Sequence, residues 1–118
     1  MADVHRFIGL AGIAVAAVAL AWSVIIVAAR REAGRPYLVG LAVVVIVAVA
    51  AAVGGLILLL TGAGPADPLH IVYGAIAVLA IPAGIAVAAG RTPRRQSIVL
   101  LVAVLVELGV TVRLLQTG

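Results

Sequence analysis

The sequence predicts an all-α fold, a four-helix transmembrane bundle, from its composition and from the length and spacing of its apolar segments. Hydrophobic residues make up 66% of the 118 residues and charged residues only 10%, which is more apolar surface than a soluble domain of this size can bury. Four apolar segments are each long enough to cross about 30 Å of hydrocarbon. We expect one domain, residues 1–118, with helices at about 7–29, 37–60, 70–89 and 97–115.

Each segment is best interpreted as a helix that stays in the membrane. The first is too long for a secretory signal, and its arginines follow the apolar run instead of preceding it. The second contains a valine-rich stretch at 43–49 that would suit a strand, but four segments cannot close a β-barrel. Asp67-Pro68 precedes the third segment and Thr92-Pro93 the fourth, a pattern typical of helix starts and of breaks between helices.

The arginines predict how the bundle is oriented. Arg30, Arg31 and Arg35 lie between the first two helices, and Arg91, Arg94 and Arg95 lie between the last two, whereas the link 61–69 has no basic residue. The positive-inside rule then places both arginine-rich links in the cytoplasm and both termini outside. This gives an up-down-up-down, multi-pass protein of a bacterial plasma membrane. Arginines that flank membrane helices are topology signals, so the basic composition does not indicate nucleic-acid binding.

The chain also resembles two helical hairpins joined in tandem. Residues 5–21, HRFIGLAGIAVAAVALA, align without gaps to residues 70–86, HIVYGAIAVLAIPAGIA. Both stretches begin with histidine, have glycine four residues later, and share much of their small-residue pattern. An internal repeat of two hairpins is one interpretation of this match, and chance similarity is the other, because matches of this kind arise easily in Ala/Val-rich sequence.

His5 and His70 are the only histidines, and they are the strongest candidates for a functional site. Both begin apolar helices that start on the same side of the membrane, and the first and third helices of an up-down bundle are diagonal neighbours. Their imidazoles are therefore expected to face each other across the bundle axis. Imidazole is a common ligand of haem iron, so the pair predicts two metal ligands.

Residues around the histidines fit a flat cofactor. Small residues follow each histidine at helical spacing and leave room for a macrocycle, an aromatic residue lies nearby on each helix, and two outer arginines are candidates to pair with propionates. The predicted cofactor-binding residues besides the histidines are Gly9, Gly12, Gly74, Ala77, Tyr73, Arg6 and Arg113, with Phe7 near the same site.

The sequence is also compatible with two alternative roles for the histidines. Histidine, tyrosine and arginine at helix ends are common interfacial anchors. A copper ion between the imidazoles is a further alternative, but two nitrogen ligands would leave it under-coordinated. The chain has no cysteine, so disulfides, thiolate metal sites and thiol catalysis are excluded.

The segment GGLILLLTGAGPADPLH, from Gly54 to His70, resembles the helix, polar link and ligand histidine in one four-helix half of the haem A synthases. His5-Arg6 is similar to the HR pair that begins the preceding ligand helix, so the resemblance covers about the first three helices. It implies that His5 and His70 are axial ligands of one b-type haem toward the outer face, as in four-helix membrane b-type cytochromes. Those synthases have a glutamate where Ala2 stands and a second histidine pair, and this chain has neither.

Glu107 is the one acidic residue in the middle of a predicted helix, where an ionised carboxylate costs roughly 3 kcal/mol or more. It is a candidate proton site, or a neutral acid that hydrogen-bonds within the bundle. No nucleophile triad, phosphate loop or paired carboxylates occur, so the sequence identifies no catalytic residue and leaves enzymatic activity undecided.

Three functions are compatible with these features. The leading one is a haem b protein for electron transfer, or an accessory subunit of a respiratory membrane complex, with a quinone, that complex or a second copy of the chain as partner. The second is a cofactor-free structural or assembly subunit of a membrane complex. The third is a small proton-coupled transporter that uses Glu107.

Overall fold

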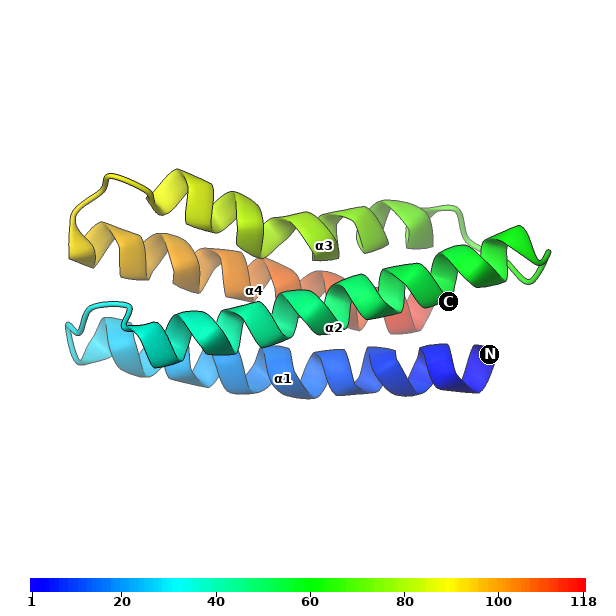
Figure 1. Ribbon diagram of the computed structural model, residues 1–118, viewed down its shortest axis with the longest axis horizontal. Helices are drawn as coiled ribbons and strands as arrows, with labels where there is room; N and C mark the ends of the chain where they lie inside the picture. Colours follow the sequence, from blue (N-terminus) through cyan, green and yellow to red (C-terminus); the bar gives the residue numbers. More distant parts are fainter.

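A computed structural model describes all residues, 1–118, as four α-helices joined by short links (Figure 1). The helices are α1 (Ala2–Ala28), α2 (Arg35–Leu60), α3 (Leu69–Ala88) and α4 (Pro93–Thr117). Successive helices run in opposite directions, so both termini and the α2–α3 link lie at one end, which we call the histidine end (Figure 1). The opposite end, with the arginine-bearing α1–α2 and α3–α4 links, is the arginine end. The all-helical, four-helix prediction is confirmed.

The order of packing puts α1 and α3 on one diagonal and α2 and α4 on the other. α1 packs against α2 and α4, and α3 packs against the same two helices, whereas α1 and α3 are not neighbours. A side chain of α1 can therefore meet one of α3 only across the middle of the bundle.

All four helices are long and apolar enough to cross a membrane. Their outward faces carry large hydrophobic side chains, with Phe7 71% exposed and Leu60 77% exposed. Exposed apolar surface on this scale is unfavourable in water and is normal for a protein surrounded by lipid.

Two helix starts lie earlier than the sequence indicates. α1 begins at Ala2, so His5 lies within its first two turns, and Asp3 in the first turn is compatible with the positive helix N-terminus. α4 begins at Pro93, because Thr92 has the extended conformation of an N-cap residue and proline suits the first helical position. At the start of α3, the backbone N–H of Leu69 donates to Asp67 Oδ1 at 2.9 Å.

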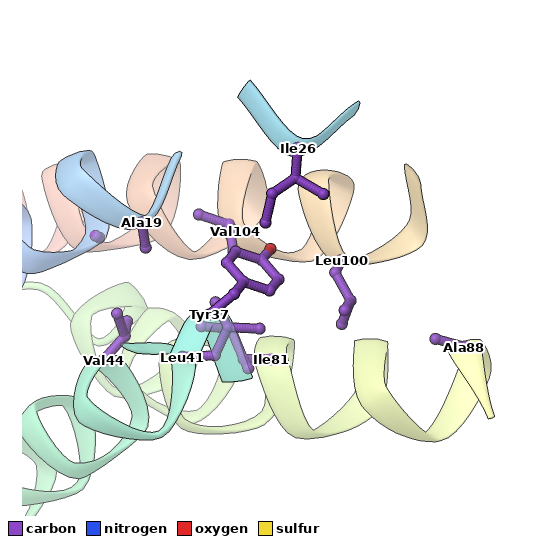
Figure 2. Packing of buried hydrophobic residues seen from close by; sticks show 10 residues of the cluster. Ala19, Ile26, Tyr37, Leu41, Val44, Ile81, Ala88, Leu100 and Val104 are labelled. Atoms are coloured by element: carbon purple, nitrogen blue, oxygen red, sulfur yellow. The ribbon is translucent and has the colours of Figure 1, made fainter. Parts of the chain in front are cut away.

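The hydrophobic core fills the arginine half of the bundle (Figure 2). Leu41 and Val104 are fully buried there, and the ring of Tyr37 lies among aliphatic side chains of the other helices (Figure 2). At the arginine end, the Arg94 guanidinium donates to the Val27 carbonyl, and Ser97 Oγ lies 3.1 Å from both the Arg31 and the Pro93 carbonyl oxygens. These contacts tie α4 to the last turn of α1 and to the link that follows it.

A buried pair of hydroxyls joins α1 to α2 within this core. Ser23 Oγ donates to the Ala19 carbonyl at 2.7 Å and lies 2.6 Å from the Tyr37 hydroxyl. Because a serine hydroxyl has one hydrogen, Tyr37 is the donor in the second bond. The ring of Trp22 packs edge-on against Tyr37, with ring centroids 5.8 Å apart.

Substituting Ser23 by alanine should destabilise the bundle by about 1–3 kcal/mol, because the buried Tyr37 hydroxyl loses its acceptor. Adding Tyr37→Phe should recover most of this loss, since the unpaired hydroxyl is then removed as well. Thermal unfolding in detergent, followed by circular dichroism, measures both variants. If the double variant is no more stable than Ser23→Ala, the hydroxyl pair is not the source of the effect.

Candidate functional site

The two imidazoles meet at the histidine end. His5 comes from α1 and His70 from α3, and their ring centroids are 6.0 Å apart with the ring planes at 60°. Since α1 and α3 are diagonal helices, the rings reach each other across the bundle interior. Two imidazoles bound on opposite sides of one metal atom, with metal–nitrogen bonds of about 2 Å, have ring centres about 6 Å apart. The separation therefore fits a pair of ligands to one metal atom.

The ring of His5 is seated against two glycines of α2. A Cβ atom at Gly55 would lie 3.2 Å from His5 Cε1, and one at Gly54 would lie 3.4 Å from Nδ1. Nδ1 itself is buried and has no hydrogen-bond partner. These two glycines were not among the predicted site residues. Their signal was the adjacent pair inside a helix, where glycine is costly and often marks a close approach.

The ring of His70 is held by the end of α4. His70 Nδ1 lies 3.2 Å from Thr117 Oγ1, and that hydroxyl donates to the Arg113 carbonyl at 3.0 Å. The threonine hydrogen is already used, so His70 donates from Nδ1 and keeps the lone pair of Nε2 free. This tautomer is the one that metal-bound histidine adopts when a second partner orients its ring. Thr117 was not predicted, because its contact depends on the register of α4 against α3.

The small residues predicted beneath the histidines have two different surroundings. Gly9 faces Leu115 and Gly12 faces the Thr111 methyl group, with Cβ positions 3.7 and 3.5 Å from these α4 atoms. These two positions therefore face side chains of α4 at ordinary van der Waals distance and not an open cavity. A Cβ at Gly74 would meet nothing within 4 Å, which leaves open space one turn below His70.

The remaining predicted residues lie around the site without direct bonds to the histidines. Ala77 is buried in α3 and Tyr73 is half-buried. Arg6 is exposed, and Arg113 is exposed and donates to Gln116 Oε1 at 2.9 Å. Phe7 lies on the exterior and does not line the site.

The donor set limits which metal centre these residues can hold. No group of three or more His, Cys, Asp or Glu side chains comes together anywhere in the chain. Zinc and copper sites in proteins commonly need three or four protein ligands, whereas haem iron brings four nitrogen ligands of its own and needs only axial ones. Two convergent imidazoles therefore fit haem iron better than a bare ion.

Glu107 lies apart from the histidine pair, inside the bundle. It is only 2% exposed, its Oε1 lies 3.4 Å from Thr111 Oγ1, and its Oε2 is buried without a partner. Thr111 Oγ1 donates instead to the Glu107 backbone carbonyl at 2.7 Å. Gly118 at the end of α4 lies next to His70 and is eleven residues from Glu107. At the helical rise per residue, Glu107 is therefore about 16 Å from the histidines along the helix axis.

No known protein family matches the chain, and comparisons with curated proteins and with solved structures find no similar protein. The contacts at the histidine end are therefore the basis for the function proposed below.

Proposed function

We propose that this chain is a small integral membrane protein that binds one haem b, with His5 and His70 as its axial ligands. The observation that carries the proposal is the meeting of the two histidines, from diagonal helices, at a ring separation of 6.0 Å. Both side chains are only partly exposed, and one has an unpartnered nitrogen. Burying two imidazoles together has little structural benefit, and it is the arrangement that a bis-histidine iron site requires.

The surrounding residues support this role in distinct ways. Thr117 is positioned to orient His70, and the absence of side chains at Gly54 and Gly55 leaves room for the His5 ring against α2. The open space at Gly74 offers room beside the pair. In this proposal the half-buried Tyr73 borders the cofactor, and Arg6 and Arg113, which are exposed at the same end, pair with its propionates. When bound, the haem supplies a one-electron redox centre.

The membrane arrangement follows from the arginines. With the arginine end in the cytoplasm, all four helices span a bacterial plasma membrane and the histidine end faces outward, together with both termini. A single haem near the outer face cannot pass electrons across the whole bilayer. The protein therefore acts with a quinone, a larger respiratory complex or a second copy of the chain.

Reconstitution tests the proposal directly. The detergent-purified protein, titrated with haem b, should bind one equivalent and give the low-spin spectrum of two axial imidazoles, with a b-type reduced-minus-oxidised difference. Detergent micelles without protein are the control for haem that only partitions into detergent. Absence of stoichiometric binding would reject the proposal. Copurification of a colourless protein with a larger complex would then support a cofactor-free subunit.

A further inference from the structure

Glu107 lies near the middle of the bundle, and its neighbours can be placed from observed contacts. Gly12 faces Thr111, so Ala16, one turn further along α1, is level with Glu107. Ser23 of α1 is bonded to Tyr37 of α2, so Val44, two turns from Tyr37, lies at the height of Ala16, two turns from Ser23.

Gly84 of α3 faces Ala103 of α4 in the same way. Ala80, one turn before Gly84, therefore lies at the height of Glu107, one turn after Ala103. At the height of the carboxyl, the three other helices therefore carry apolar residues, and the polar side chain in contact with it is Thr111 of its own helix.

No charged group is placed to neutralise the carboxylate. On its own helix the nearest cation is Arg113, which is exposed and bonded to Gln116. The titratable side chains of the other helices that are buried or half-buried are His5, His70 and Tyr73 in the histidine half and Tyr37 on the arginine side, where Tyr37 is bonded to Ser23. An ionised carboxylate in such surroundings is strongly disfavoured, so the group is expected to hold a proton.

The interior on the arginine side of Glu107 is packed mainly with apolar side chains. Every residue of the hydrophobic core lies level with Glu107 or beyond it toward the arginine end, and the side chains labelled in Figure 2 belong to this set. Leu41 and Val104, one turn below the carboxyl, are fully buried, and Ile81 is 1% exposed. The buried side chains in this direction are mainly aliphatic, and the three buried hydroxyls among them, Ser23, Tyr37 and Ser97, already have hydrogen-bond partners. The core residues are Ala16, Ala19, Ile26, Tyr37, Leu41, Val44, Ile81, Ala88, Leu100 and Val104.

On the histidine side of Glu107 the buried residues are fewer and smaller. Besides Glu107 itself, the buried residues in this half are Gly54, Ala77 and Thr111, none with a side chain larger than threonine. The two buried side-chain atoms without hydrogen-bond partners in the whole chain, Glu107 Oε2 and His5 Nδ1, lie at the two ends of this half. Water that enters from the histidine end would satisfy both, and the Thr111 hydroxyl lies between them.

We infer that Glu107 is a proton-binding site that exchanges its proton only with the aqueous phase at the histidine end. The proton passes Thr111 and the part of the bundle between Glu107 and the histidines, where the buried residues are small. A proton adds to one carboxylate oxygen and leaves again along the same route, and no electron is transferred. The site is independent of the haem, because its position depends on α4 and on the core beneath it.

Infrared spectroscopy of the haem-free protein in lipid nanodiscs tests the inference. The C=O band of a protonated carboxyl should be present at neutral pH and absent in Glu107→Gln. After transfer to D₂O, the shift of this band reports proton exchange. Thr111→Val should slow the shift by about an order of magnitude, since one hydrogen-bonding hydroxyl on the route is lost. Thr111→Ser, which keeps the hydroxyl, should restore the rate.

Ser23→Ala is the matched control, because Ser23 carries a buried hydroxyl on the arginine side of Glu107, as Thr111 does on the histidine side. It should leave the exchange rate unchanged. The inference is overturned if no carboxyl band depends on Glu107, or if Ser23→Ala slows exchange and Thr111→Val does not. Because haem is not used, these outcomes are separate from the success or failure of haem binding.

Discussion

Haem binding with a low-spin spectrum is expected to be lost when His70 is replaced by alanine, and equally when His5 is replaced. In the proposed site each histidine would supply one of only two protein ligands, and no cluster of three or more His, Cys, Asp or Glu side chains is present to replace it. Removing either one leaves iron with a single axial imidazole, which weakens binding and changes the spin state. Absorption spectra of the reconstituted variants measure both effects.

Two controls separate ligand loss from a damaged fold. Free imidazole added to His70→Ala should partly restore the low-spin spectrum, which requires an intact cavity. Thr117→Val keeps both ligands but removes the hydroxyl next to His70 Nδ1. It should retain the low-spin spectrum with haem affinity lower by about 10- to 100-fold, as for other partners of ligand histidines. An unaltered spectrum in His70→Ala would show that His70 is not a ligand.

Replacing Gly84 by leucine is expected to prevent α3 from packing on α4. Even a methyl group at this position would lie 2.5 Å from Ala103 Cβ, which cannot rotate away. Gly84→Ala should therefore cost about 1–3 kcal/mol of folding free energy through overpacking, and leucine should cost more. Unfolding in detergent followed by circular dichroism measures the loss, with size-exclusion chromatography to detect misassembly.

The same helix provides the matched control. Gly74→Ala introduces its methyl group where nothing lies within 4 Å, so it should be neutral or stabilise the protein by up to about 1 kcal/mol through helix propensity. Combining Gly84→Ala with Ala103→Gly exchanges the two side chains across the contact and should recover stability. Equal effects of alanine at positions 74 and 84 would contradict the close approach of α3 and α4.

The sequence predicts the architecture well because the physical constraint is simple. A chain this apolar, divided by short polar links, must satisfy its backbone within helices, and the segment lengths then set the number of helices. The helix starts were less predictable. Asp3 and Arg6 are polar but compatible with a helical turn, so hydropathy alone places the start of α1 too late.

Of the candidate site, the sequence predicts that the two histidines meet, and it does not predict the surroundings of the glycines near them. His5 and His70 are unique in the chain, and their positions on alternate helices indicate that they lie on a diagonal. Glycine gives no such distinction, because a small residue serves equally well for close helix packing and for a cofactor cavity. Gly12 contacts α4 and Gly74 faces open space, yet the sequence pattern around them is the same. Register between helices decides the difference, and local sequence does not encode it.

The contact of Trp22 with Tyr37 has a practical consequence. Trp22 is the only tryptophan in the chain, and it packs against Gly40 and Tyr37 in the arginine half. Seventeen residues of α1 separate it from His5, about 25 Å along the helix. Indole emission at this distance from a strongly absorbing porphyrin is quenched by energy transfer, so intrinsic fluorescence becomes a label-free gauge of cofactor occupancy.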